Sequence, residues 1–198
     1  MFQYYLFNKP YQVLSQFSKE GEKETLADYL VDIPKDVYPV GRLDYDSEGL
    51  LLLTNDKRFN ALMLQPRFSH TRTYWVQVEG LITKEALESL AKGVFISIEG
   101  KKYFTKKAVV SILPDDWTIW ERNPPIRFRK NSPTSWFSLT LIEGKNRQVR
   151  KMTATVGFPT LRLVRAQIGK IKIDDLVSGK YRNLTSYEIE EILKIALK

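Results

Sequence analysis

The order of hydrophobic and polar residues along the chain predicts strands and helices that follow one another without a fixed repeat. The clearest strand is the run of four leucines at residues 50–53, which is bounded by a glycine and by polar residues. Its length and uniform hydrophobicity predict a strand that is buried on both faces. Alternation of apolar and polar positions, rich in β-branched and aromatic residues, predicts further strands at residues 2–7, 72–79, 135–143 and 160–168.

Apolar residues spaced three or four apart predict helices in several of the intervening segments. Polar residues that can cap a helix precede these segments, and glycine or proline follows them. The expected helices cover residues 25–31, a segment between a cap at Asn55 or Asp56 and a stop at Pro66, a segment between Thr83 and Gly93, residues 147–156, and a C-terminal segment opened by a capping box of Thr185 and Glu188.

The segment EGKNRQVRKM, residues 143–152, is expected to lead from a turn into a helix. Asn146 can cap this helix, and Gly157 is placed for the left-handed residue that often ends one. Helical spacing puts an apolar stripe beside a basic face. The stripe consists of Val149, Met152 and Val156, and the basic face of Arg147, Arg150 and Lys151.

The mixture of strands and helices follows neither strict βαβ alternation nor a glycine-rich dinucleotide pattern. It therefore predicts an α+β fold with a mixed, largely antiparallel sheet. Residues 115–133 are rich in Trp, Arg and Pro, and Pro124 with Pro125 predicts a long loop there. Trp117 and Trp120 in this loop can stack on nucleic-acid bases or fix the loop to the body, and the sequence supports both interpretations equally.

Composition excludes several classes of site. The 198 residues, 43% of them hydrophobic, suit one compact domain or two small lobes sharing one core. There is no Cys and one His, His70, so disulfides, thiol nucleophiles and Cys/His zinc sites are excluded. His70 lies in a polar stretch and is expected to be a solvated loop residue. Because neither a signal peptide nor a run of about 20 apolar residues occurs, we expect a cytoplasmic protein without a membrane partner.

The charge is distributed unevenly. The net charge is +8 at pH 7. Residues 101–170 carry 15 basic and 4 acidic residues, a net charge of +11, whereas the rest of the chain carries 16 basic and 19 acidic residues, a net charge of −3. Ordinary solvated charge is one interpretation of this asymmetry. A basic half beside a mildly acidic one favours nucleic acid as the partner.

Residues 41–56, GRLDYDSEGLLLLTND, place Arg42 and Asp44 on a turn-prone stretch directly before the predicted leucine strand. A carboxylate at the end of a buried strand is held rigidly and stays accessible, as catalysis requires. On spacing alone, a turn is the simpler interpretation, since Asp44, Asp46, Ser47 and Gly49 could do no more than form one.

This segment resembles the signature of the ribosomal RNA pseudouridine synthases of the small-subunit synthase A family. Together with NKPYQVLSQF, RNPPIRFRK and the segment around EGKNRQVRKM, the resemblance covers about residues 5–170. It implies two α+β lobes with a mixed central sheet and a catalytic cleft between them. Many members carry a separate small RNA-binding domain at the N-terminus, and we expect residues 1–198 to form a single catalytic domain without it.

The resemblance also implies the roles of individual residues. Asp44 is the essential carboxylate, which either attacks C1′ of the uridine or removes the proton from C2′, and the sequence does not choose between them. Arg150 is expected to pair with Asp44, and Tyr74 to stack on the uracil, although Tyr74 could also be a core residue of its strand. Arg165 is expected to be structural. The expected RNA contacts are Arg42, Arg72, Lys145, Arg147 and Lys151.

Within the family, the matching segments are most similar to a synthase that modifies large-subunit (23S) ribosomal RNA, so this RNA is the expected substrate and partner. No cofactor or metal is expected, and the chain is expected to be a monomer. Three alternatives remain at this point. They are the same chemistry on small-subunit ribosomal RNA or transfer RNA, a non-catalytic RNA-binding protein of ribosome assembly, and a glycosidase-like enzyme that uses Asp44 with Asp46 or Glu48.

Overall fold

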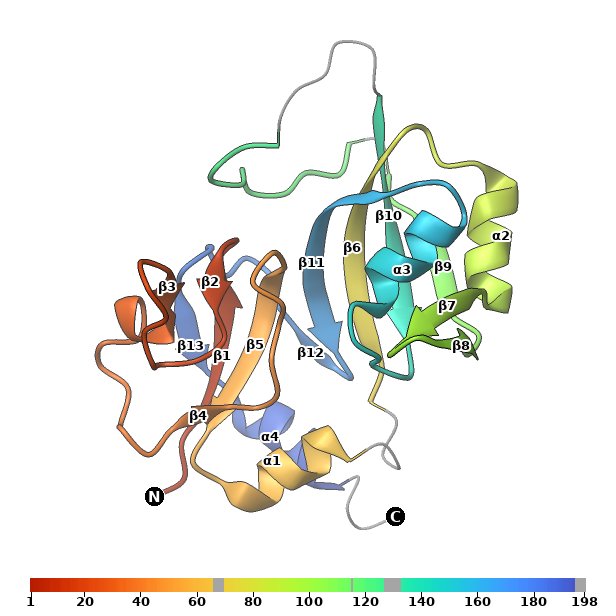
Figure 1. The fold of residues 1–198 in the computed structure, drawn as a ribbon. Helices are drawn as coiled ribbons and strands as arrows, with labels where there is room; N and C mark the ends of the chain where they lie inside the picture. Colours follow the sequence, from red (N-terminus) through yellow and green to blue (C-terminus); the bar gives the residue numbers. More distant parts are fainter. Residues whose placement is uncertain (66–69, 115, 127–132, 195–198) are drawn as a thin grey trace. The chain divides into compact units, whose positions relative to one another are not determined.

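The computed structural model describes residues 1–65, 70–114, 116–126 and 133–194. The chain divides into two compact units, each described by itself below (Figure 1). The first unit consists of Met1–His70 and Arg165–Lys198, and the second of Thr71–Val164. The predicted α+β class with a mixed, largely antiparallel sheet is confirmed. The cleft expected from the resemblance stays a prediction.

The first unit is built on strand β1, which pairs antiparallel with β5 on one side and with β13 on the other. All seven residues of β5 are buried, which confirms the strand predicted from the leucine run. Leu51 and Leu53 pack with Phe7 in one core cluster, and the alternate leucines point to the other face, because successive side chains of a strand alternate. The strands of this unit are β1 (Tyr4–Lys9), β2 (Val13–Leu14), β3 (Glu24–Thr25), β4 (Tyr38–Pro39), β5 (Glu48–Thr54), β12 (Ile171–Lys172), β13 (Tyr181–Asn183) and the last part of β11 (Thr160–Ile168).

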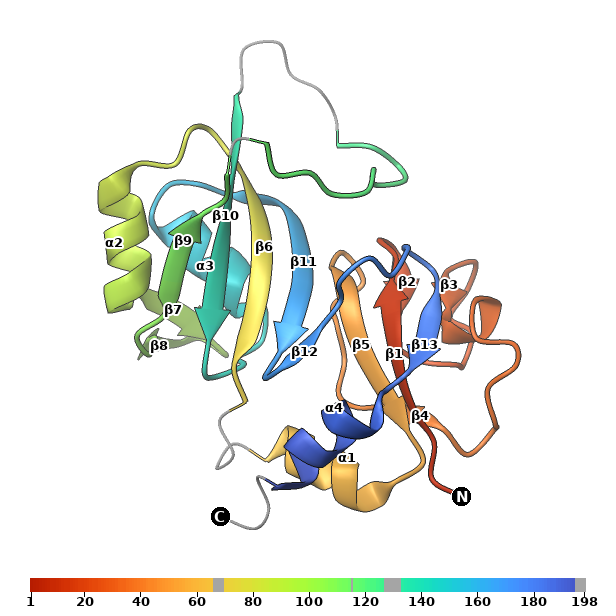
Figure 2. The same ribbon diagram turned by 180° about the vertical axis from the view of Figure 1, so that it is seen from behind.

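Two helices of the first unit, α1 (Lys57–Leu64) and α4 (Ser186–Leu193), pack against each other (Figure 2). The side chain of Asp56 accepts a hydrogen bond from the Arg58 amide at 2.8 Å, so Asp56 is the cap of α1. The helix expected at residues 25–31 is wrong in extent, because only one 3₁₀ turn, Leu26–Asp28, forms. A segment this short, followed by a proline that disfavours helical backbone before it, cannot sustain an α-helix.

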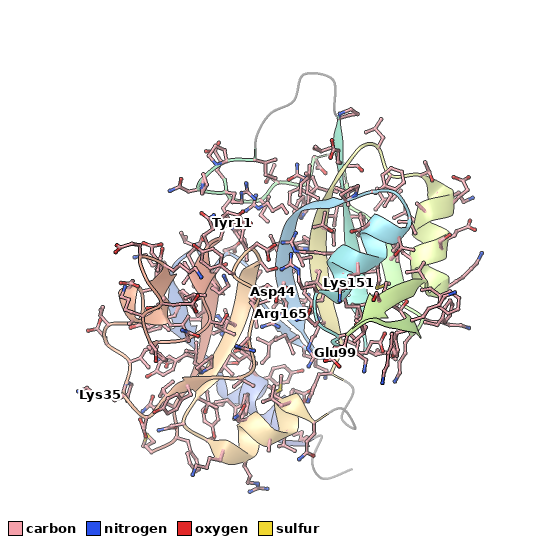
Figure 3. The ribbon with its side chains drawn as sticks, viewed as in Figure 1. Tyr11, Lys35, Asp44, Glu99, Lys151 and Arg165 are labelled. Atoms are coloured by element: carbon pink, nitrogen blue, oxygen red, sulfur yellow. The ribbon has the colours of Figure 1, made fainter. Side chains whose placement is uncertain are left out.

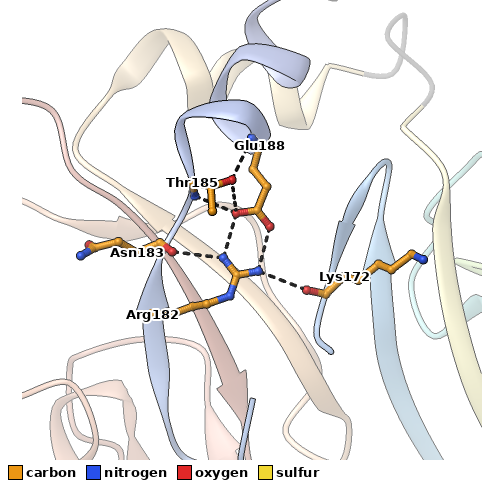
Figure 4. Close-up of polar contacts among 5 residues, drawn as sticks. All are labelled: Lys172, Arg182, Asn183, Thr185 and Glu188. Atoms are coloured by element: carbon orange, nitrogen blue, oxygen red, sulfur yellow. Dashed lines mark hydrogen bonds and ion pairs between the residues drawn. The ribbon is translucent and has the colours of Figure 1, made fainter. Parts of the chain in front are cut away.

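The predicted capping box of α4 is present and is reinforced by an ion pair (Figure 4). The Thr185 hydroxyl accepts a bond from the Glu188 amide at 3.2 Å, and the Thr185 amide donates to Glu188 at 2.8 Å. Arg182 holds the same carboxylate through two nitrogens, each at 2.8 Å. Burial raises the pKa of Glu188, but the bonds from Arg182 and Thr185 outweigh this effect and hold its pKa below the usual value.

The second unit contains an antiparallel sheet in which β10 (Thr134–Leu141) lies between β6 (Arg72–Glu79) and β9 (Val109–Ile112). A hairpin of β7 (Phe95–Ile98) and β8 (Lys101–Phe104) forms a separate two-stranded sheet. The helices are α2 (Lys84–Lys92), which begins after Thr83 and ends at Gly93 as predicted, and α3 (Gln148–Thr155). Residues of β6, β10, α2 and α3 share one hydrophobic core, which includes Val76, Phe137, Leu90 and Met152.

The prediction that Asn146 caps α3 is wrong. The residue at the N-cap is Arg147, whose backbone is left-handed (φ 51°) and whose side chain makes no capping bond. The Gln148 side chain instead accepts a hydrogen bond from the Lys145 amide at 2.9 Å, which closes the turn before the helix. Gly157, with φ 88°, takes the left-handed conformation predicted after the helix.

The expectation that His70 is solvated is also wrong. Only 6% of His70 is exposed, and its Nε2 lies 3.1 Å from the carbonyl oxygen of Leu62. Its polar sequence neighbours concealed this burial, because the partner is a backbone carbonyl of α1, eight residues earlier. A buried imidazole with such a partner is a structural residue.

Of the two interpretations of the tryptophan-containing loop, packing supports the structural one. Trp117 lies between Trp75 and Trp136 of the sheet, with ring centroids 5.1 Å away in both cases. Arg162 is 5% exposed and donates to the carbonyl oxygen of Trp120 at 2.9 Å. The described part of the loop is therefore fixed to the second unit by its own aromatic rings.

Candidate active site

Asp44 stands at the junction between a fixed turn and a buried strand. The Ser47 amide donates to the Asp44 carbonyl oxygen at 3.0 Å, and β5 begins at the next residue, Glu48. On the other side, buried Leu43 is tied to Ser15, whose hydroxyl donates to the Leu43 carbonyl at 2.9 Å and accepts from its amide at 3.1 Å. The backbone that carries the half-buried Asp44 is therefore held at both ends.

A lysine is completely buried near this carboxylate. Lys9, the last residue of β1, is 0% exposed, and its backbone lies opposite Gly49 at the start of β5. Its ammonium donates hydrogen bonds to the carbonyl oxygens of Pro10 and Val13, each at 2.8 Å. Burying an ammonium is costly even when it is hydrogen-bonded, so the charges around it decide whether it stays protonated.

Three carboxylates and one arginine act on Lys9. The pKa of Lys9 falls from 10.5 to about 7, because the lowering effects of burial and of Arg165 exceed the raising effects of Glu48, Asp46 and Asp44. All four side chains must therefore lie within electrostatic reach of the same ammonium. The structure brings Asp44 into one charged cluster with Lys9 and Arg165, all within the first unit.

Arg165, which the sequence predicts to be structural, belongs to the same charged cluster. It is 6% exposed, and its Nε donates to the carbonyl oxygen of Leu50 at 2.8 Å. The labelled side chains of Asp44 and Arg165 lie near one another in Figure 3. A signal was present in the sequence, since a permanently charged group inside the apolar strand at residues 160–168 requires an anionic or carbonyl partner.

Tyr74 and Arg150, the other predicted catalytic residues, belong to the second unit. Tyr74 is half-buried in β6 and packs against the core of that unit. Arg150 is half-buried on α3, and its Nη1 lies 3.4 Å from the carbonyl oxygen of Thr160. Because Asp44 lies in the first unit, the predicted Asp44–Arg150 ion pair stays a prediction.

The predicted phosphate contacts present their charges at the surface. Lys145 and Arg147, in the turn before α3, are exposed, and the Lys145 ammonium lies 5.1 Å from the centre of the Tyr103 ring. Arg72 and Lys151, of the same unit, are half-buried. Arg42, in the first unit, is exposed beside the Asp44 turn.

In the part of the chain that the structure describes, no group of three or more His, Asp or Glu residues could hold a metal ion, and no helix is long and apolar enough to cross a membrane.

Comparison with known proteins identifies the class to which this site belongs. Residues 3–155 match the family model described as RNA pseudouridylate synthase. The chain is 53% identical over 180 residues to ribosomal large subunit pseudouridine synthase E of Vibrio parahaemolyticus, covering 90% of this chain and 72% of the relative. It is 49% identical over 173 residues to the synthase E of Xanthomonas axonopodis pv. citri, covering 86% and 88%. The chain therefore belongs to the RNA pseudouridine synthase family, a family of isomerases.

A solved structure supports the same assignment. The fold matches a crystal structure of a pseudouridylate synthase with a TM-score of 0.78 and 29% sequence identity, over 97% of this chain and 74% of the other. The resemblance inferred from GRLDYDSEGLLLLTND is thus confirmed at the level of family and fold. The roles of the individual site residues stay predictions.

Proposed function

We propose that this chain converts one uridine of large-subunit ribosomal RNA to pseudouridine. The observation that carries the proposal is the identity of about half the residues, over most of both chains, with relatives named ribosomal large subunit pseudouridine synthase E. We also propose that the chain acts as a monomer in the cytoplasm. The uneven charge of the sequence supports RNA as the partner.

The reaction exchanges one bond to the sugar for another. The bond from C1′ to N1 breaks, the uracil turns over, C5 joins C1′, and the proton lost from C5 balances the one gained at N1. In our proposal the Asp44 carboxylate starts this sequence, either as a nucleophile at C1′ or as a base at C2′. The rigid turn that carries Asp44 supports this role, because a catalytic group must keep its position within a fraction of an ångström.

A guanidinium beside Asp44 would hold the carboxylate in position through two parallel hydrogen bonds. Two arginines can supply it. Arg150 is the choice that follows from its position in the RQVRKM segment. We propose Arg165 as the partner within the first unit, which also contains Asp44. Both side chains act on the same buried ammonium, that of Lys9.

The remaining predicted residues would hold the RNA. A uridine in folded RNA must leave its stack to reach Asp44, which costs a few kcal/mol. We propose that Arg42 occupies the vacated space or binds the phosphate of the extruded nucleotide, and that Tyr74 stacks on the uracil. The surface cations of the second unit, Arg72, Lys145, Arg147 and Lys151, would bind phosphates.

Mapping pseudouridines in a strain that lacks this chain tests the substrate. The proposal predicts that one large-subunit site is lost and that the wild-type chain restores it. A site lost from small-subunit ribosomal RNA or transfer RNA would instead support the same chemistry on another RNA. If no site is lost and purified protein binds ribosomal RNA without releasing tritium from C5-labelled uridine, the chain is a non-catalytic RNA-binding protein.

A further inference from the structure

The β7–β8 hairpin of the second unit has one face that the core does not use. Ile96, Ile98 and Tyr103 pack with the hydrophobic core, and alternation along each strand turns the neighbouring side chains away from it. Phe95 and Phe104 are on this outer face, directly opposite each other in the strand register. Their exposed fractions are 52% and 51%, so burial does not account for two large aromatic residues here.

The two rings and a lysine form a defined group. The centroids of Phe95 and Phe104 are 4.8 Å apart with the planes at 63°, an edge-to-face pair. The ammonium of Lys102 lies 4.2 Å from the centre of the Phe95 ring. The hairpin therefore displays aromatic rings and a cation on one surface, the combination with which proteins bind single-stranded nucleic acid.

The charge around this group is one-sided. Residues 95–107, FISIEGKKYFTKK, contain four lysines and one acid, Glu99, which lies at the hairpin turn. All four lysines are exposed, and they are Lys101, Lys102, Lys106 and Lys107. A polyanion complements this surface better than a neutral or acidic partner does.

The hairpin is also joined to the loop that carries predicted phosphate contacts. Tyr103 of β8 donates a hydrogen bond to Glu143 at 2.6 Å, and the amide of Lys106 donates to the same carboxylate at 2.9 Å. The Lys145 ammonium lies 5.1 Å from the Tyr103 ring. The hairpin lies beside α3, to which the hydroxyl of Thr155 connects it (Figure 1). These contacts fix the core-facing side of the hairpin to the turn before α3.

We propose that the outer face of the β7–β8 hairpin binds a single-stranded segment of the RNA substrate. Phe95 and Phe104 stack on bases, and Lys102, with Lys106 and Lys107 directly after the hairpin, binds the phosphates between them. The choice of RNA as the ligand rests on the proposed function. Stacking on phenyl rings tolerates any base, so the hairpin adds affinity and leaves the choice of uridine to the site around Asp44.

Binding of a fluorescent oligouridylate of about 12 nucleotides tests the proposal without requiring activity. F95A/F104A should weaken binding about tenfold, because stacking of a base on an aromatic ring is lost. F95L/F104L keeps apolar bulk in the hairpin and should weaken binding to the same degree. Y38A removes an equally exposed aromatic residue from the first unit and should leave binding unchanged. In K102A the slope of log affinity against log salt should fall by about 0.7 for the lost phosphate contact.

Affinities of both phenylalanine variants within about twofold of wild type would overturn the proposal, since a lost stacking contact costs more. Loss of binding to phosphatidylserine vesicles in F95A/F104A, with unchanged RNA affinity, would assign the surface to a membrane and also overturn the proposal.

Tritium release from a ribosomal RNA fragment separates this proposal from the proposed function. In this assay F95A/F104A and F95L/F104L should raise KM and leave kcat unchanged, because they remove binding that is common to the ground state and the transition state. An inactive wild-type protein that binds RNA through Phe95 and Phe104 would refute the proposed function alone.

Discussion

Replacing Lys9 by Met tests the charged cluster around Asp44 through its dependence on pH. Lys9 is 0% exposed, and burial lowers its pKa from 10.5 to about 7. In the unfolded chain the lysine titrates near its ordinary pKa. Between about pH 7 and 10.5 the unfolded state therefore binds more protons than the folded state, and the free energy of unfolding should rise with pH.

The magnitude follows from the two pKa values of Lys9. A difference of about 3.5 units corresponds to about 5 kcal/mol, which burial of the ammonium costs in full below pH 7. The cost falls as the pH rises, and between pH 7 and pH 9 about 2 kcal/mol of it is relieved. Lys9→Met fills the same space without an ionisable group, so its stability should lack this component of the pH dependence.

Urea unfolding of both proteins at pH 7, 8 and 9 measures the difference directly. The free energy of unfolding of the wild type should increase between pH 7 and 9 by about 2 kcal/mol more than that of the Lys9→Met variant. Comparing the two pH dependences cancels every other group that titrates in this range. Parallel curves for the two proteins would show that the ammonium keeps an ordinary pKa and that the cluster does not depress it.

Three further predictions concern single positions. Arg165→Lys should lower kcat in tritium release at least tenfold, because a lysine cannot reproduce a guanidinium contact with both carboxylate oxygens. The kcat of Arg150→Lys should stay above that of Arg165→Lys. The opposite order would make Arg150 the partner of Asp44. Gly93→Ala should lower the thermal midpoint, since its added Cβ would lie 2.4 Å from the Thr105 carbonyl oxygen and φ is +104°; an unchanged midpoint would refute this packing. The folded state holds the pKa of Glu188 low, so the wild type should lose stability as the pH falls from 5 to 3 and Glu188→Gln should lose less, which urea unfolding at both pH values checks.

Local patterns in the sequence predicted the longer strands and the four α-helices of the described residues, but none of the strands of four residues or fewer. The leucine run predicted β5, and alternation predicted β6 with its observed bounds, Arg72–Glu79. Thr83 caps α2 as predicted, and Asp56 is the one of the two candidates, Asn55 and Asp56, that caps α1, with each capping bond spanning two or three positions. These features depend on neighbours in the sequence, so the sequence displays them.

The main errors concern backbone conformations and contacts that the pattern of hydrophobic and polar residues does not display. His70 is buried against a carbonyl of α1, and the start of α3 is closed by the side chain of Gln148 through a left-handed Arg147. The hydrogen bond from Arg165 to Leu50 spans 115 positions, so the residues around position 165 do not display it. The buried position of Lys9 was missed for the same reason, since its burial depends on how β1 and β5 pair.

Tritium release from C5-labelled uridine in a ribosomal RNA fragment, measured for Asp44→Asn beside Asp46→Asn, tests the central claim most directly. The asparagine at position 44 keeps the shape of the turn and removes the carboxylate, whereas the change at position 46 removes a neighbouring charge from the same turn. We predict no release above background for Asp44→Asn with RNA binding retained, and clear release for Asp46→Asn. Release by Asp44→Asn at the wild-type rate would contradict the assignment of the chemistry to this carboxylate.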